Sequence, residues 1–176
     1  GGGAVVGADN PLMDLARHLG TTARRGPGYD HDMVGFNYRM TNLQAAVGCA
    51  QMERLAELLA AKRRIRAVYN QAFAGLAGLA PFPGGADDGN ACWLSGVVAA
   101  DPASAEALRA RLVEAGIEAK PFWKPIHLQA PYRDAPSTAQ ATSESLWQRV
   151  VTLPCSTDLT ESDQARAVAA VKGRAK

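Results

Sequence analysis

A long stretch of helical periodicity is the feature that most constrains how this chain can fold. From Thr41 to about Gly75, apolar side chains recur at helical spacing and no proline interrupts them. Thr41 and Gln44 have the spacing of a capping box, in which the threonine hydroxyl accepts from a first-turn N–H and the glutamine accepts from the N–H of Thr41 itself. A helix of this length exceeds the average of about 11 residues in globular proteins. The sequence therefore predicts a connecting helix over residues 41–78, between two globular parts.

The chain beyond this helix is predicted to alternate between strands and helices. Residues 79–90 are rich in proline and glycine, which predicts a loop and a domain boundary. Apolar, β-branched runs predict three strands, at residues 91–99, 117–122 and 150–153. Helices are expected to begin after these runs, at Asp101-Pro102, at Ser137 or Thr138, and at Thr160. This order indicates the α/β fold class, with a small domain over residues 79–176.

The segment ahead of the long helix, residues 1–40, gives weaker signals. Residues 1–7 are expected to form the edge of a strand. Asn10 is expected to cap a short helix that Gly20 ends, with Pro11 at its first position. Residues 21–34 are predicted to be a loop. Within that loop, Asp30-His31-Asp32 has the composition of a metal site but lacks a further ligand at a suitable spacing, so we interpret it as solvated.

The composition argues against several classes of protein. A hydrophobic content of 47% and a charged content of 20% are ordinary for a globular protein. The net charge of +2 gives no field that would attract a nucleic acid. No run of about 18 apolar residues is present, so we expect no membrane span. The three cysteines lie far apart and form neither a metal spacing nor a disulfide framework, which favours a cytoplasmic protein.

Two segments concentrate side chains that could bind a ligand. Asn37 and Arg39 lie two apart in expected extended chain, so both would face one way and suit a phosphate or carboxylate. The alternative is that Asn37 caps a turn and Arg39 is a surface charge. Trp123, Lys124 and His127 lie in a proline-rich loop and suit a sugar and a diphosphate. The alternative there is a connector in which Trp123 is buried and His127 bonds a backbone carbonyl.

Three stretches, in order, resemble motifs of one enzyme family. In chain order, they are the glycine run at residues 1–6, then Gly35-Phe36-Asn37-Tyr38-Arg39-Met40-Thr41-Asn42 followed by Ala45-Ala46, and then Trp123-Lys124-Pro125-Ile126-His127-Leu128-Gln129. Together they resemble the DegT/DnrJ/EryC1/StrS family of pyridoxal-phosphate sugar aminotransferases. The third stretch is similar to the form found in enzymes that aminate UDP-linked 4-keto-6-deoxy sugars. The resemblance covers essentially the whole chain.

The resemblance implies a fold, a cofactor and a reaction. The fold would be the C-terminal part of an aspartate-aminotransferase-like fold, with residues 1–40 ending the large domain, 41–78 connecting and 79–176 forming the small domain. The cofactor would be pyridoxal 5'-phosphate. The reaction would transfer an amino group from glutamate to a 4-keto-6-deoxy nucleotide sugar in polysaccharide or glycan biosynthesis. The protein would be a homodimer, or would associate with a missing N-terminal half.

The resemblance also implies roles for single residues. Asn37 corresponds to an asparagine that binds the cofactor phosphate of the partner subunit, while Arg39 and His127 correspond to positions that face the amino donor or the sugar substrate. Trp123 is assigned to substrate binding from the composition of its loop. The Schiff-base lysine of the family lies just before the glycine run, so no catalytic residue is assigned in this chain and the chain alone is expected to be inactive. Lys120 stands where related sequences often carry arginine, which leaves the sugar open. The alternative to an enzyme is a non-catalytic α/β domain that binds a small molecule or regulates.

Overall fold

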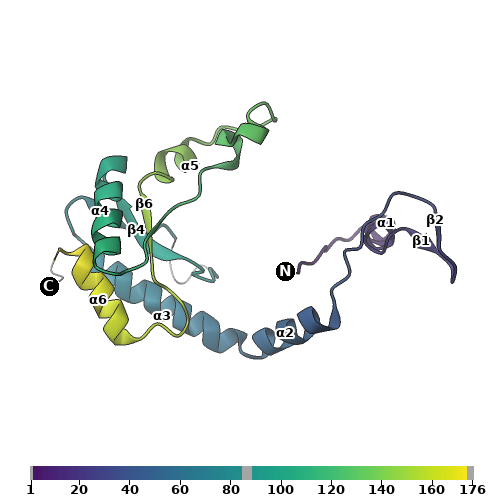
Figure 1. Ribbon diagram of the computed structural model, residues 1–176, viewed down its shortest axis with the longest axis horizontal. Coiled ribbons are helices and arrows are strands. Elements are labelled where there is room, and N and C mark those ends of the chain that lie inside the picture. The colour runs from purple at the N-terminus through teal and green to yellow at the C-terminus, as the bar shows by residue number, and fades with distance from the viewer. Residues whose placement is uncertain (1, 85–88, 174–176) are drawn as a thin grey trace. The chain divides into compact units, whose positions relative to one another are not determined.

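The computed structural model describes residues 2–84 and 89–173, which combine helices with antiparallel strands (Figure 1). Internal contacts divide the chain into two compact units. The N-terminal unit comprises Gly1–Leu55 and the C-terminal unit comprises Ala56–Lys176. No helix among the described residues is both long enough and apolar enough to cross a lipid bilayer.

The first helix of the N-terminal unit is α1 (Asn10–Gly20). Its cap is Asp9, whose carboxylate accepts the backbone N–H of Leu12 at 3.0 Å, so the expectation that Asn10 is the cap was wrong by one residue. Pro11 fits the first turn because the N–H that it lacks would have no partner inside the helix there. The predicted end of the helix at Gly20 is confirmed.

The strand expected over residues 1–7 does not form in residues 2–7, and Gly1 lies outside the described residues. A strand exists only when a neighbour satisfies its backbone N–H and C=O groups, and no segment within 2–84 or 89–173 pairs with this one. The predicted strand edge was therefore wrong, because the part of the chain that the structure describes supplies no pairing partner.

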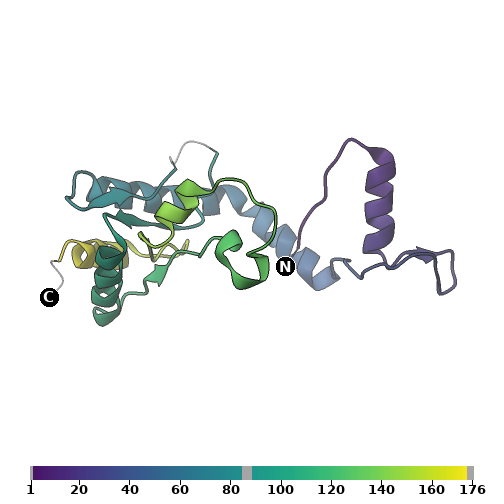
Figure 2. The same cartoon turned by 90° about the horizontal axis from the view of Figure 1, so that it is seen from above.

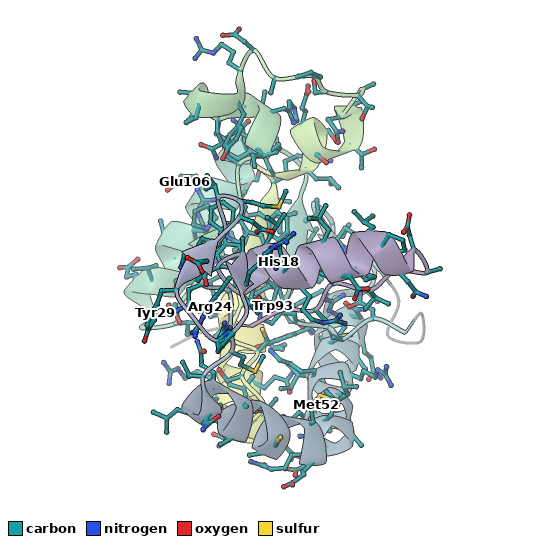
Figure 3. All side chains as sticks on the ribbon, turned by 90° about the vertical axis from the view of Figure 1, so that its right-hand side faces the viewer. His18, Arg24, Tyr29, Met52, Trp93 and Glu106 are labelled. Carbon is teal, nitrogen blue, oxygen red and sulfur yellow. The ribbon has the colours of Figure 1, made fainter. Side chains whose placement is uncertain are left out.

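The loop expected over residues 21–34 contains a short hairpin. Its strands are β1 (Arg24–Arg25) and β2 (Asp30–His31), which pair antiparallel. The Arg24 guanidinium lies over the Tyr29 ring at 4.8 Å from its centre, a cation–π contact that closes the turn (Figure 3). Local side-chain contacts therefore order a segment whose composition predicts only a loop.

The long helical stretch forms two helices rather than one. They are α2 (Asn42–Glu53) and α3 (Leu55–Phe73). The predicted capping box at the start of α2 is confirmed, with Thr41 as the cap and Gln44 bonding back to its N–H at 2.9 Å. Arg54 breaks the pattern with φ −99° and ψ 3°, outside the helical well. Because α2 buries none of its residues, no packing within the described chain holds the two helices continuous.

An antiparallel sheet of four strands forms the centre of the C-terminal unit, in the order β3-β4-β6-β5. The strands are β3 (Leu79–Pro81), β4 (Ser95–Ala99), β5 (Lys120–Pro121) and β6 (Val150–Leu153). The two central strands lie inside the predicted runs 91–99 and 150–153. The run 117–122 shortens to two residues at the sheet edge, because Pro121 cannot donate to a ladder. Leu79–Pro81 was expected to be loop, and residues 85–88 of that predicted loop lie outside the described residues.

Two of the three remaining helices have the N-cap residues that the sequence predicted. The three helices are α4 (Pro102–Glu114), α5 (Ala141–Leu146) and α6 (Glu161–Val171). Asp101 caps α4 and Thr160 caps α6, as predicted. The third helix, α5, starts later than the expected Ser137 or Thr138, because the Thr138 hydroxyl instead accepts from Gln140 Nε2 at 2.8 Å and stays outside the helix.

The hydrophobic core lies between this sheet and helices α3, α4 and α6. Helices α4 and α6 pack beside each other, as Figures 1 and 2 show. From α3, Ile65, Tyr69 and Phe73 are almost fully buried and join side chains of the two central strands. The Tyr69 hydroxyl donates to the Pro154 carbonyl at 2.8 Å, and burial raises the pKa of this phenol well above its usual range. The second half of the long helical stretch is thus part of the core of the C-terminal unit.

Candidate functional site

The segment that carries Asn37 and Arg39 is fixed against the end of α1. Phe36 N donates to the Leu19 carbonyl at 2.7 Å, and Tyr38 N donates to the Gly20 carbonyl at 2.9 Å. An isolated bridge also joins Asn37 to Thr21. These bonds hold an otherwise irregular segment in one extended conformation.

Gly35 permits this close approach. A β-carbon built on it would lie 2.5 Å from both the backbone N of Ala23 and the carbonyl carbon of Thr22. Thr22 and Ala23 themselves have positive φ values of 68° and 51°, which non-glycine residues seldom adopt. Strain of this kind persists only where the surroundings enforce it, and it concentrates at functional segments.

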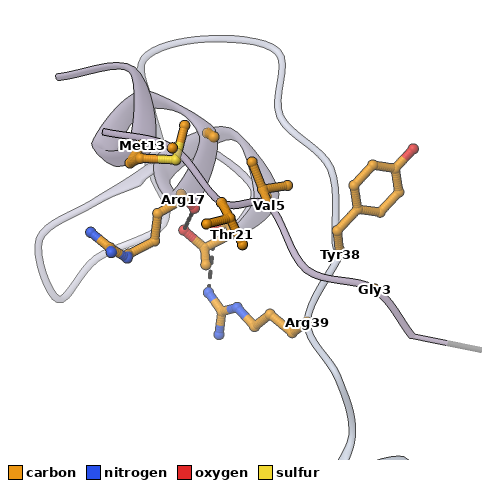
Figure 4. Close-up of a pocket in the computed structure, with 11 residues that line it drawn as sticks. Gly3, Val5, Met13, Arg17, Thr21, Tyr38 and Arg39 are labelled. Carbon is orange, nitrogen blue, oxygen red and sulfur yellow. Dashed lines mark hydrogen bonds between the residues drawn. The ribbon is translucent and has the colours of Figure 1, made fainter. Parts of the chain in front are cut away.

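The structure places Arg39 in a hollow and leaves Asn37 outside it. The hollow has a volume of about 590 Å³ and is lined by Gly3, by the chain at residues 5–7 and 38–39, and by α1 with the adjoining Thr21. Arg39 donates to the Thr21 carbonyl at 3.3 Å, and Arg17 lines the same hollow (Figure 4). Asn37 is exposed, and its side chain makes no hydrogen bond with any described residue. Its amide is therefore available to an external group.

A second hollow brings together His127 and Trp123 in the C-terminal unit. It has a volume of about 520 Å³ and lies between the loop at residues 122–127 and the segment of residues 140–147, which contains α5. Lys124 lines it as well. The predicted combination of imidazole, ammonium and indole is thus present around one cavity. Lys120, by contrast, pairs with Glu118 at 2.6 Å and is not among the lining residues.

His127 is held by a carboxylate rather than by a backbone carbonyl. Its Nε2 lies 2.9 Å from Oε1 of Glu144 on α5, and its side chain is 17% exposed. The alternative interpretation of this loop as a connector, in which His127 would bond a backbone carbonyl, is therefore wrong for His127. Glu144 was not predicted, because no local pattern connects residues 17 positions apart before the chain folds.

Trp123 is exposed and stacked rather than buried. Its ring lies 5.3 Å from that of Trp93 and 5.2 Å from that of Phe122, and 59% of the residue is exposed. Trp93 is also exposed and was not singled out from the sequence. A tryptophan just before an apolar strand is most simply interpreted as a core residue. Only the stacking of Trp93 on Trp123 indicates that it belongs to the candidate site. The two indoles form an open aromatic surface that can pack against a ring.

The loop that contains Asp30, His31 and Asp32 forms a cluster of hydrogen bonds and ion pairs. Asp32 accepts from His18 Nε2 at 2.6 Å and from Arg25 Nε at 2.5 Å, while His31 Nδ1 donates to the Thr22 carbonyl at 2.7 Å. In the described part of the chain, no three side chains of His, Cys, Asp or Glu are placed to hold a metal ion.

This cluster gives the hairpin a pH dependence. Hydrogen bonds from His18 and then Arg25 hold the pKa of Asp32 below its ordinary value of 3.8. A lowered folded-state pKa stabilises the fold above pH ~4, and the contribution is lost as pH falls through that lowered value. We expect an NMR titration of the Asp32 carboxyl carbon to give a midpoint below 3.8. Asp32→Asn should abolish the matching shift of the hairpin signals, and a midpoint at or above the ordinary value would contradict the prediction.

Comparison with known proteins identifies relatives along nearly the whole chain. The model of the DegT/DnrJ/EryC1/StrS aminotransferase family matches residues 1–172. EpsN of Bacillus subtilis (strain 168), named as a pyridoxal phosphate-dependent aminotransferase, is 34% identical over 173 residues, which cover 96% of this chain and 45% of that protein. GDP-perosamine synthase of Caulobacter vibrioides is 34% identical over 179 residues, which cover 97% of this chain and 47% of that protein.

Solved structures agree with the fold. The structure of DesV from S. venezuelae matches with a TM-score of 0.80 at 28% identity, over 96% of this chain and 45% of that one. A DegT DnrJ EryC1 StrS aminotransferase from Brucella abortus matches with a TM-score of 0.77 at 28% identity, over 94% and 44%. The predicted α/β fold class is confirmed. The chain spans about half the length of the curated relatives it matches.

Proposed function

This chain belongs to the DegT/DnrJ/EryC1/StrS aminotransferase family, and on that premise we propose that it is part of an enzyme that aminates a nucleotide sugar. The acceptor is a 4-keto-6-deoxy nucleotide sugar, and glutamate is the amino donor. The observation that carries the proposal is the cavity that joins His127, Lys124 and Trp123, because a phosphorylated sugar needs a cation, a polar ring and an aromatic wall. The name of the Caulobacter relative, GDP-perosamine synthase, supports a sugar nucleotide.

The proposal includes the division of the complete enzyme. Residues 1–40 end a large domain, residues 41–78 connect, and residues 79–176 form the small domain. The lysine that carries the coenzyme belongs to a part of the enzyme outside this sequence. The family match over residues 1–172, together with a coverage of about half of each relative, supports a longer enzyme of which this chain is a part. The protein acts in the cytoplasm as a homodimer, and its product enters polysaccharide or glycan biosynthesis.

The exposed segment around Asn37 fits the phosphate of pyridoxal 5'-phosphate. The Asn37 amide has no hydrogen-bond partner among the described residues, and backbone hydrogen bonds on either side hold the segment that carries it. Such an unpaired donor on an ordered backbone segment suits an anionic oxygen of a coenzyme in the partner subunit. When bound, the coenzyme supplies the electron sink through which the amino group is moved. Arg39, His127 and Trp123 would bind and orient the substrate, and their side chains would exclude water from it.

Coenzyme retention tests the role of Asn37. In the complete enzyme, expressed from the coding sequence that contains this chain, we expect Asn37→Ala to raise the dissociation constant of pyridoxal 5'-phosphate about tenfold, through loss of a hydrogen bond to a charged group. The measurement is the visible absorbance that remains after dialysis. Asn10→Ala, an exposed asparagine on α1, is the matched control and should retain the coenzyme. Equal retention by both variants would remove Asn37 from the cofactor site.

Activity tests the enzyme assignment itself. We expect the complete enzyme to transfer the amino group of glutamate to a 4-keto-6-deoxy nucleotide sugar, and this chain alone to show no turnover. A chain that turns over by itself would mean that another lysine serves. A complete protein that binds nucleotide sugars but transfers no amino group would favour the alternative, a non-catalytic binding or regulatory domain.

A further inference from the structure

The contact between His127 and Glu144 determines which atoms of the imidazole ring can meet a ligand. His127 Nε2 lies 2.9 Å from Glu144 Oε1. An ionised carboxylate can only accept, so Nε2 must carry the proton of this bond. Nδ1 is then the ring nitrogen that remains, and it makes no hydrogen bond to the residues that the structure describes. A ligand can therefore use Nδ1 and not Nε2.

Both partners in this contact are fixed by their own backbone. His127 lies in the 3₁₀ turn η1 (Ile126–Leu128), where Leu128 N donates to the Pro125 carbonyl at 3.0 Å. Gln129 Nε2 closes the same loop onto the Lys124 carbonyl at 3.2 Å. Glu144 lies on α5, and its backbone N–H donates to Gln140 at 3.0 Å. The contact therefore joins two ordered elements, which is how a side chain is held in a single orientation.

His127 lines the second hollow, whereas Glu144 does not. The Glu144 carboxylate is half exposed and lies 2.9 Å from the imidazole, which itself lines the hollow. We propose that Glu144 is a positioning residue, which holds His127 with a protonated Nε2 so that Nδ1 accepts a hydrogen bond from a sugar hydroxyl. A neutral ring has one donor and one acceptor nitrogen, and the carboxylate selects which is which.

The neighbouring side chains define the ligand class that this nitrogen serves. Lys124 supplies an ammonium for anionic oxygens, and the Trp123 indole supplies a flat apolar surface. A bare Nδ1 adds an acceptor for a hydroxyl. A phosphorylated hexose presents all three kinds of group. This assignment rests on the proposed function for the nucleotide sugar, while the pairing of Glu144 with His127 does not.

Imidazole tautomers test the pairing without any enzymatic activity. The sequence has three histidines, so the His127 ring can be resolved in a two-bond ¹H–¹⁵N correlation spectrum of the full chain. We expect one set of signals for His127, with Nε2 protonated. Glu144→Ala should convert it to an averaged mixture of both tautomers. Glu114→Ala, an exposed glutamate on α4, is the control and should leave the ring unchanged. Identical His127 signals in Glu144→Ala and in the unaltered chain would overturn the proposal.

Kinetics of the complete enzyme test the consequence for the substrate. Glu144→Ala should raise the KM for the nucleotide sugar about tenfold with a smaller change in kcat, because the lost bond serves binding. Glu144→Gln keeps an acceptor oxygen and should restore most of the affinity. In a His127→Ala background, Glu144→Ala should have no further effect, since the carboxylate acts through the ring. An additional loss in that background would overturn the positioning role.

The two proposals fail in different ways. If the tautomer signature depends on Glu144 but the complete protein aminates no nucleotide sugar, the positioning role is supported and the substrate class is overturned. If the protein aminates a nucleotide sugar while Glu144→Ala leaves both the His127 signals and KM unchanged, the proposed function survives and this inference is overturned.

Discussion

Arg66→Ala is expected to lower the free energy of unfolding of the C-terminal unit by about 4 kcal/mol. Arg66 is only 1% exposed, although it lies on α3 and carries a charge. Its guanidinium donates to the Leu94 carbonyl, to Ser95 Oγ at 3.2 Å, and to two carbonyls at residues 83–84, and it lies 4.6 Å from the centre of the Phe82 ring. Truncation would leave the buried Ser95 hydroxyl and the partly buried Leu94 carbonyl without this donor, which would destabilise the folded state.

Arg66 is also connected to the candidate site through a series of aromatic contacts. Phe82, which it contacts, packs edge-on against Phe122 at 5.8 Å, and Phe122 lies against Trp123. Leu94, whose carbonyl it binds, directly follows Trp93. Removing the guanidinium should therefore loosen the stacked indoles as well as destabilise the sheet.

Urea unfolding followed by tryptophan fluorescence measures this effect. All three tryptophans of the chain, Trp93, Trp123 and Trp147, lie in the C-terminal unit, so the signal reports on that unit. Arg64→Ala is the matched control, because Arg64 is exposed on the same helix and its loss should cost less than about 0.5 kcal/mol. Equal unfolding midpoints for the two variants would contradict the prediction. Arg66→Lys should recover only part of the loss, since an ammonium cannot reproduce the fork of donors.

Gly96→Ala is expected to be the second most damaging change, with a loss of about 3 kcal/mol. Gly96 lies in the central strand β4, where it pairs with Thr152 of β6. A β-carbon at this position would lie 2.2 Å from the carbonyl oxygen of Val151. No rotamer can relieve a clash between a β-carbon and backbone, so the two central strands would have to move apart.

Gly48→Ala provides the matched control for Gly96→Ala. Gly48 lies in the exposed helix α2, and a β-carbon there would meet no atom within 4 Å. The same substitution should therefore raise helicity by far-UV circular dichroism, since alanine favours a helix over glycine by about 0.5–1 kcal/mol. For Gly96→Ala, an unfolding midpoint unchanged from that of the parent chain would show that the strands accommodate the added methyl group.

The sequence predicted three helix caps correctly and misplaced two, since Asp9 and not Asn10 caps α1, and α5 begins after Ser137 and Thr138. Thr41 with Gln44, Asp101 and Thr160 all cap helices as expected, because a cap and its partner lie within one turn of each other. It predicted less where the outcome depends on a partner elsewhere. The extended chain at residues 2–7 has no pairing strand among the described residues, and the helical periodicity around Arg54 could not show that the helix is interrupted there.

The candidate site likewise contains residues that the sequence predicted and partners that it did not. Trp123, Lys124 and His127 lie in one short loop, so their gathering around a cavity could be expected from the sequence. Their partners could not. Trp93 reaches Trp123 from 30 positions away, and Glu144 reaches His127 from 17. No periodicity or motif connects residues across such separations, because their contact exists only once the sheet and α5 have assembled.

By itself, the sequence determined the family, the local helix caps and the loop that carries His127. These depend on side chains and backbone groups within a few residues of each other, and short-range chemistry acts before and after folding alike. Only the tertiary structure decided that an arginine on α3 would be buried among carbonyl groups, and that a carboxylate on α5 would hold the imidazole. Both outcomes arise from the close packing of distant elements, which places polar groups where each must find its partner.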